Sequence, residues 1–257
     1  NIGSEENVRQ VVEKAKKAGI PIRVGVNSGS LEKDILEHYG RVTAEGLAES
    51  ALRNVALLEK YDFDDIVISL KSSDEKMNFD AYRIVDERSP YPLHIGVTEA
   101  GTVGRGKVKS AAGIGALLLC GIGDTMRVSL TADPVEEVIF AKELLAATGI
   151  RKDRIEIVSC PTCGRTEVDL QVIAGEIERR VELLQDRGVR DLKIAVMGCA
   201  VNGPGEAKGA DIGVACGKGK GVIFAGGSIL KTVSEEEIAD EIIKLAEEYE
   251  KNTGRID

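Results

Sequence analysis

Short apolar runs alternate with longer amphipathic stretches over the first 150 residues of the chain. Runs rich in β-branched residues predict four strands, at 22–26, 66–70, 93–97 and 126–130. Between them apolar residues recur with helical spacing and predict helices at 5–18, 44–60, 75–87 and 134–147. A further helix is predicted at 105–119, although glycines weaken it. Alternating strands and helices predict a parallel sheet.

The pattern changes after residue 150, where strands begin to follow one another directly. Two strands are predicted at 155–159 and 193–197, with a helix at 167–188 between them. Three more follow at 211–215, 221–225 and 229–233, joined by glycine-rich turns that predict a meander. Ser234 and Glu237 form a capping box that begins a last helix, ending near residue 251. We therefore expect two domains, 1–150 and 151–257, and the second to be a small α+β domain.

Three polar residues lie at or just past the ends of successive predicted strands. Lys71, Glu99 and Arg127 are each 28 residues apart, a spacing typical of one βα unit. Such positions recur around a common axis in a (β/α)8 barrel, whose strand ends form the site. The alternative is that charged residues simply begin the loops. The fold class we predict is α/β, the C-terminal half of a TIM-type barrel, because only four strands are visible.

Composition excludes some classes of function. The formal net charge is -9, aromatic residues make up 4% and Trp is absent, so we expect no nucleic-acid binding. The longest apolar stretch, 111–123, is too short to cross a bilayer, and we expect no membrane association. Five cysteines, an odd number, favour a reducing cytoplasm and thiols used for metal or redox chemistry.

Three cysteines occur in turns that follow predicted strands. Cys160 and Cys163 form a CxxC turn, and Cys199 follows the next strand, so all three could ligate one iron–sulfur centre. A thioredoxin-like dithiol, inert buried thiols, or zinc held by these three and Cys216 are the alternatives. Cys120 lies in an apolar run, and we expect it in the core.

Several long motifs resemble one enzyme family over essentially the whole chain. They are Arg-Val-Gly-Val-Asn-Ser-Gly-Ser-Leu at 23–31, His-Ile-Gly-Val-Thr-Glu-Ala-Gly at 94–101, Cys-Pro-Thr-Cys-Gly-Arg-Thr at 160–166 and Met-Gly-Cys-Ala-Val-Asn-Gly-Pro-Gly-Glu-Ala at 197–207. These segments closely resemble the 4-hydroxy-3-methylbut-2-enyl diphosphate synthases of the methylerythritol phosphate pathway of isoprenoid biosynthesis.

The resemblance implies a cofactor, a reaction and site residues. It implies a 4Fe–4S cluster held by Cys160, Cys163, Cys199 and Glu206. The implied reaction is the reductive dehydroxylation and ring opening of 2-C-methyl-D-erythritol 2,4-cyclodiphosphate to (E)-4-hydroxy-3-methylbut-2-enyl diphosphate. The electron donor would be flavodoxin or ferredoxin, and the enzyme a homodimer. The implied catalytic residues are Glu99 and Glu206, and the implied substrate-binding residues are Arg23, Asn27, Lys71, Arg127 and Ser129.

The chain departs from this family at its N-terminal end. The first four barrel strands of the family have no counterpart here, and we expect the chain on its own to be inactive. Two other functions remain open: a non-catalytic zinc-binding scaffold, and a phosphate-binding barrel without redox chemistry, of the pterin-synthase type. We expect His38, in a loop, and His94, near a strand start and away from the barrel mouth, to be structural.

Overall fold

The computed structural model describes residues 5–199 and 209–253, with side chains up to residue 249. The chain folds as two separate units, Asn1–Ile150 and Arg151–Asp257. No helix within the described ranges is long and apolar enough to cross a membrane.

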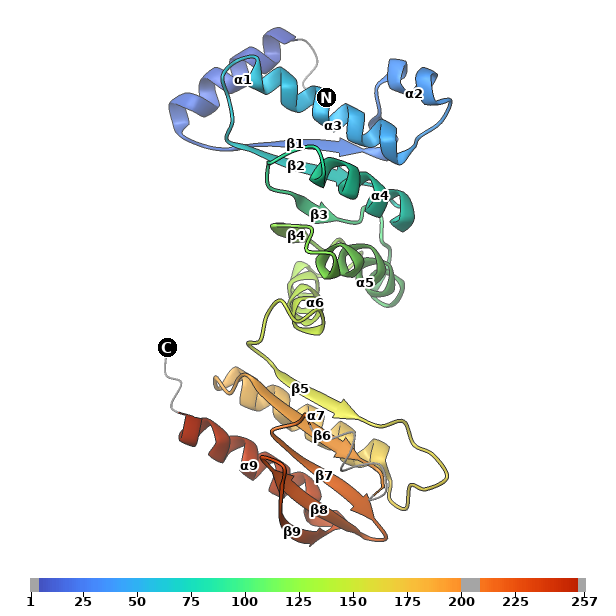
Figure 1. The fold of residues 1–257 in the computed structure, drawn as a ribbon, viewed down its shortest axis with the longest axis vertical. Coiled ribbons are helices and arrows are strands. Elements are labelled where there is room, and N and C mark those ends of the chain that lie inside the picture. Colours follow the sequence, from blue (N-terminus) through green and yellow to red (C-terminus); the bar gives the residue numbers. More distant parts are fainter. Residues whose placement is uncertain (1–4, 200–208, 254–257) are drawn as a thin grey trace. The chain divides into compact units, whose positions relative to one another are not determined.

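The first unit is a series of strand–helix repeats with parallel strands (Figure 1). Its elements in chain order are α1 (Glu5–Ala18), β1 (Ile22–Asn27), η1 (Ser28–Ser30), α2 (Lys33–Tyr39), α3 (Ala44–Glu59), β2 (Ile66–Lys71), α4 (Glu75–Asp86), β3 (His94–Gly96), α5 (Val103–Leu119), β4 (Thr125–Arg127) and α6 (Pro134–Ala147). The parallel pairs β1–β2 and β3–β4 are joined by a parallel bridge between Ile68 and Leu93. The strands therefore follow one another in chain order, as expected for consecutive βα units.

The core of this unit lies between the strands and one layer of helices. Alternate strand residues enter it, among them Val24, Ile68 and Ile95, and they meet apolar residues of α3, α4 and α5. Because strand side chains alternate in direction, the residues between these core positions lie on the opposite face of the strands. We call this opposite face, which carries Arg23, Lys71, His94 and Arg127, the helix-free face.

Two glycines explain why α5 forms despite a glycine-rich sequence. A Cβ at Gly106 would lie 2.5 Å from Leu130 Cδ2, and one at Gly113 would lie 2.6 Å from Val97 Cγ2. The glycines therefore let the helix backbone approach β3 and β4 closely, and this packing offsets their weak helix propensity.

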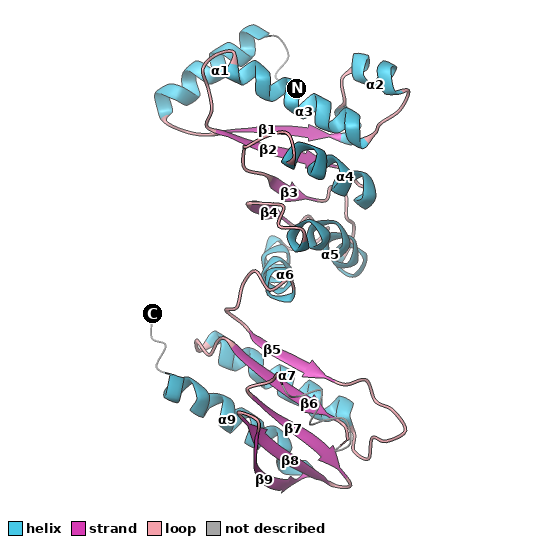
Figure 2. Ribbon diagram, in the orientation of Figure 1, coloured by secondary structure: helices cyan, strands magenta, loops and turns pink. Residues whose placement is uncertain are grey.

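The second unit is a five-stranded mixed sheet with two long helices packed against it (Figure 2). Its elements are β5 (Ile155–Ser159), α7 (Leu170–Asp186), β6 (Leu192–Met197), β7 (Ile212–Gly217), β8 (Lys220–Ala225), β9 (Ser228–Ser234), η2 (Glu235–Glu237) and α9 (Ile238–Thr253). The sheet order is β5-β6-β7-β8-β9, with β5, β6 and β7 parallel and β8 and β9 antiparallel to their neighbours. The predicted meander of the last three strands is confirmed.

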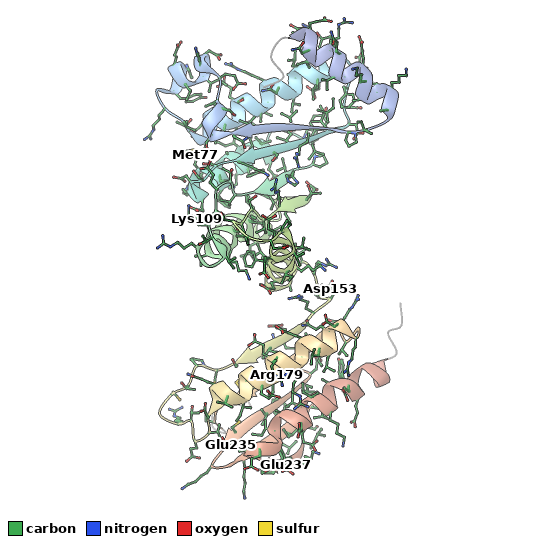
Figure 3. All side chains as sticks on the ribbon, turned by 180° about the vertical axis from the view of Figure 1, so that it is seen from behind. Met77, Lys109, Asp153, Arg179, Glu235 and Glu237 are labelled. Carbon is green, nitrogen blue, oxygen red and sulfur yellow. The ribbon has the colours of Figure 1, made fainter. Side chains whose placement is uncertain are left out.

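The start of the last helix is fixed by the predicted capping box. Ser234 N donates to Glu237 Oε2 at 3.0 Å, and the Ser234 side chain is bonded to the same residue. Figure 3 marks Glu235 and Glu237 at this turn. The turn satisfies amide groups that have no partner within the helix itself.

Two smaller sequence expectations were wrong. His38 lies in α2 and not in a loop, because a seven-residue helix with a single buried residue, Ile35, is too short to show a periodic pattern. Cys120 is exposed at the C-cap of α5 and is not in the core, because the apolar run continues onto the exposed side of the helix end, where Leu119 is itself 73% exposed.

Candidate functional site

Cationic side chains gather on the helix-free face of the first unit. Lys71 ends β2 and Arg127 ends β4, while Asn27 lies directly beside Lys71 in the β1–β2 register. Arg23 lies four residues before Asn27 on the same face, at the level of Val67. The structure therefore carries Arg23, Asn27, Lys71 and Arg127 on one face.

The charges on this face act on one another. Partial burial lowers the pKa of Lys71, and the nearby positive charges of Arg127 and Arg23 lower it further. In the described part of the chain, none of these three cations has a hydrogen bond or ion pair with another side chain. Three like charges without an anionic partner form a site that favours a bound anion.

Gly96 makes room for the side chain of Lys71. A Cβ at this position would lie 2.8 Å from the carbonyl oxygen of Arg127 and 3.3 Å from Lys71 Cε. The lysine stem therefore crosses β3 at its one residue without a side chain. No local pattern in the sequence indicates this role, because it depends on where a neighbouring strand places its lysine.

The regular 28-residue spacing does not place Glu99 level with the two cations. The bridge between Ile68 and Leu93 sets Lys71 beside Gly96, and Gly96 pairs with Arg127. Glu99 comes three residues later, in the loop after β3, and it is exposed. Its φ of 54° is in the left-handed region, which residues other than glycine rarely adopt.

The loops after β3 and β4 are tied together beyond the strands. Thr131 N donates to Gly101 O at 2.9 Å, and Thr102 and Thr131 form a parallel bridge. Ser129 lies half-buried in the second of these loops, and Glu99 lies in the first. The two predicted residues therefore belong to loops that are held side by side at the carboxyl end of the strands.

His94 lies on the same helix-free face, two residues before Gly96 in β3. Its Nδ1 atom is 2.9 Å from Thr125 Oγ1, whereas its Nε2 atom is buried and has no hydrogen-bond partner among the described residues. Burial, followed by the charges of Lys71, Arg23 and Arg127, lowers the pKa of His94 to about 4. The imidazole is therefore neutral near pH 7, below the cationic end of the strands.

The thiols of the second unit lie at the carboxyl ends of two neighbouring strands. Cys160 follows β5 and Cys199 comes two residues after β6, and these strands pair through Ser159 and Val196. Gly198 N donates to Cys160 Sγ at 3.2 Å. Cys163 is exposed, and its N–H donates to Thr166 Oγ1 at 3.2 Å.

Gly198 lies where the two cysteine loops cross. A Cβ on it would be 3.0 Å from Thr166 Oγ1 and 3.1 Å from Leu170 Cδ2. The crossing brings the CxxC turn next to the residue that precedes Cys199. No group of three or more metal-ligating side chains is already gathered among the residues the structure describes, and Glu206, in 200–208, lies outside them.

The donors present fit an iron–sulfur cluster. Three thiols lie in loops at the carboxyl ends of two neighbouring strands. A backbone N–H already donates to one of these sulfurs, as is usual around such clusters. Cys216 is different because it is fully buried in β7. Burial raises the pKa of this thiol to about 12, with smaller contributions from Glu235 and Cys160. In the absence of a metal this thiol therefore stays protonated near neutral pH.

Comparisons with known proteins identify the family. The GcpE TIM-barrel domain matches residues 1–142 and the GcpE protein C-terminal domain matches residues 156–248. A protein from Clostridium acetobutylicum named 4-hydroxy-3-methylbut-2-en-1-yl diphosphate synthase (flavodoxin) is 57% identical over 244 residues, which are 95% of this chain and 69% of the relative. Relatives with the same name from Caldanaerobacter subterraneus subsp. tengcongensis and Geobacillus kaustophilus are 55% and 53% identical, covering 98% and 97% of this chain and 70% and 67% of their own lengths.

These matches bear directly on the expectations from sequence. The predicted fold class, barrel-type α/β followed by a small C-terminal domain, is confirmed. The resemblance read from the motifs at 94–101, 160–166 and 197–207 is confirmed by identity over nearly the whole chain. The chain belongs to the GcpE family.

Proposed function

We propose that the protein is an iron–sulfur oxidoreductase that converts 2-C-methyl-D-erythritol 2,4-cyclodiphosphate into (E)-4-hydroxy-3-methylbut-2-enyl diphosphate. One observation carries this proposal: Arg23, Lys71 and Arg127 meet on one face without an anionic partner in the described residues. A cyclic diphosphate supplies the missing negative charge. The names of the relatives support the product, since each is called a synthase of this diphosphate.

The residues of the first unit hold the substrate by its phosphates. The two arginines can each form two parallel hydrogen bonds to phosphate oxygens, whereas Lys71 acts as a point charge. The side chains of Asn27 and Ser129 add neutral donors beside these cations. Because Lys71 is already partly desolvated, its attraction to an anion is stronger than that of a lysine in water.

Glu99 is the candidate for proton transfer. Its loop is tied to that of Ser129, so its carboxylate is held near the proposed phosphate site. A carboxyl group in this loop can take up and release a proton as the substrate oxygen leaves.

Cys160, Cys163, Cys199 and Glu206 would hold the 4Fe–4S cluster, which when bound would pass on, one at a time, the two electrons that an external donor supplies. Glu206 is proposed from the motif at 197–207. The protein chain contributes the sulfur ligands and the Gly198 N–H that donates to Cys160 Sγ. We propose flavodoxin as the electron donor, following the relatives' names, with ferredoxin as the alternative. A homodimer in the cytoplasm remains a prediction.

The proposal is tested on protein that carries the complete barrel and is purified without oxygen, because we expect no turnover without the first four barrel strands of the family. Iron and acid-labile sulfide are measured first, and turnover of the cyclodiphosphate with reduced flavodoxin second. Lys71→Met should raise KM at least tenfold, because it removes a desolvated charge–phosphate contact. Lys109→Met is the matched control, because Lys109 forms a 3.3 Å ion pair with Glu75 on the helix layer (Figure 3). Zinc in place of iron, or full iron content with no conversion of the cyclodiphosphate, would contradict the proposal.

A further inference from the structure

Two regular hydrogen bonds between β2 and β3 are replaced by side chains from α4. The bridge between Ile68 and Leu93 and the bond from Ile68 N to Pro92 O set the register of these two strands. In that register, Leu70 N would donate to His94 O, and Ser72 N to Gly96 O. The ladder resumes beyond this point, where Thr98 N donates to Ser72 O at 3.3 Å.

The hydroxyl of Tyr82 takes the place of the first bond. Leu70 N donates to Tyr82 Oη at 3.0 Å, and Tyr82 Oη donates to His94 O at 2.7 Å. The tyrosine is completely buried, and this burial raises the pKa of its hydroxyl well above the usual range. The hydroxyl therefore keeps its proton and remains a donor.

The amide of Asn78 takes the place of the second bond. Ser72 N donates to Asn78 Oδ1 at 3.1 Å, and Asn78 Nδ2 donates to Gly96 O at 3.1 Å. Asn78 is 1% exposed. The two side chains are four residues apart on α4 and therefore lie on the same side of the helix.

Lys71 lies between Leu70 and Ser72, the two residues whose backbone N–H groups bond to side chains of α4. Leu70 and Ser72, its direct neighbours, donate to the two inserted side chains, and the strand opposite is held at His94 and Gly96. The lysine stem crosses Gly96 at this same level. The start of α4 is also fixed close by, since Met77 N donates to Asp74 Oδ1 at 2.8 Å (Figure 3 marks Met77).

We propose that Asn78 and Tyr82 are positioning residues that separate β2 from β3 and thereby hold Lys71 over Gly96, aimed at the bound phosphates. Neither side chain needs to touch the substrate. The strands are widened where the lysine crosses, and the inserted groups bond to Leu70 N, Ser72 N, His94 O and Gly96 O, which the widening separates. This inference rests on the proposed function in one respect, namely that Lys71 binds a phosphate group.

A double-mutant cycle tests the inference on the intact, anaerobically purified protein. Binding of inorganic diphosphate and of the cyclodiphosphate is measured by calorimetry for wild type, Asn78→Leu, Lys71→Met and the double variant. We expect Asn78→Leu to weaken binding roughly tenfold or more, because the lysine is displaced. In the Lys71→Met background, the same change should cost less than about twofold, since residues that act through one another are not additive.

Two further variants separate positioning from folding. Tyr82→Phe keeps the ring and removes only the hydroxyl, so it should fold and show the same dependence on Lys71. Asp124→Ala is the matched control, because Asp124 Oδ2 accepts from Leu93 N at 2.7 Å, at the start of β3 and away from Lys71. It should lower Tm and leave both dissociation constants unchanged.

The outcomes distinguish this inference from the proposed function. Fully additive losses in the cycle, or an equal loss of binding in Asp124→Ala, would overturn the positioning role. Wild-type protein that binds inorganic diphosphate but does not convert the cyclodiphosphate would refute the proposed function, and the cycle with inorganic diphosphate would still decide this inference. Wild-type protein that binds neither ligand would overturn both.

Discussion

Gly96 shows how one missing side chain shapes the helix-free face. A methyl group there would press on the Arg127 carbonyl at 2.8 Å and on Lys71 Cε at 3.3 Å. We expect Gly96→Ala to lower the free energy of unfolding by about 1–3 kcal/mol and to weaken diphosphate binding, because Lys71 must move. Gly25→Ala is the matched control, because a Cβ at Gly25, on the same face of β1, would meet nothing within 4 Å. Denaturant unfolding and calorimetry check both variants, and equal effects at the two glycines would contradict the explanation.

His94 predicts a specific dependence of stability on pH. Its pKa is about 4 in the folded chain, against about 6.5 when unfolded. Between these values the unfolded chain binds more protons, so the free energy of unfolding falls as pH drops from about 6.5 to about 4.

NMR titration should show His94 still neutral at pH 5, and added inorganic diphosphate should raise its pKa by offsetting the nearby cations. His94→Gln should remove this part of the pH slope, and an unchanged slope would contradict it. His38, exposed on α2, gives the chain's other histidine signal.

At the scale of elements, Cys216 is part of strand β7, whereas the proposed cysteine ligands lie in the loops after β5 and β6. Cys216 is fully buried and its pKa is about 12, so we expect it not to react with iodoacetamide at pH 8 in the folded protein. Cys216→Ala should retain full iron and sulfide content, whereas Cys163→Ala should lose the cluster. Mass spectrometry of the alkylated peptides and metal analysis check this. Loss of metal in Cys216→Ala would instead favour the zinc alternative.

The elements themselves were largely predictable from sequence. The apolar periodicity located α1 and α6 with the bounds that the structure shows, and Ser234 with Glu237 marked the start of the last helix. α2 was missed because seven residues with one buried side chain carry no periodic signal. The interruption of the β2–β3 ladder could not be predicted either, because Tyr82 and Asn78 look like ordinary helix residues until α4 is placed against the strands.

At the scale of the whole molecule, each unit has its own hydrophobic core. We therefore expect removal of the proposed cluster to act locally. Amide hydrogen exchange should increase in the loops after β5 and β6, around residues 160–166 and 198–199, while β1 to β4 stay protected. Mass spectrometry before and after iron chelation checks this, with the metal-free Cys163→Ala variant as a control that should not change on chelation. A uniform loss of protection across both units would contradict it.

The site was predictable only in part. Motifs at 23–31 and 94–101 pointed to Arg23, Asn27 and Glu99, and the strand-end positions of Lys71 and Arg127 placed both cations on one face. The roles of Gly96 and His94 depend on contacts between strands that are distant in sequence, and no local pattern reveals them. Glu206 stays a prediction, because it lies outside the described residues.

The backbone conformation of Glu99 links the stability of the fold to the orientation of this carboxylate. A glutamate with a φ of 54° adopts a left-handed conformation that glycine adopts without strain, and this costs about 1–2 kcal/mol. This strain lowers the stability of the fold. In return, the direction of the Glu99 carboxylate is set by the main chain as well as by the side-chain rotamer. Relaxing this turn would raise the stability of the protein and leave the carboxylate proposed for proton transfer less well oriented, so stability and orientation are opposed at this single residue.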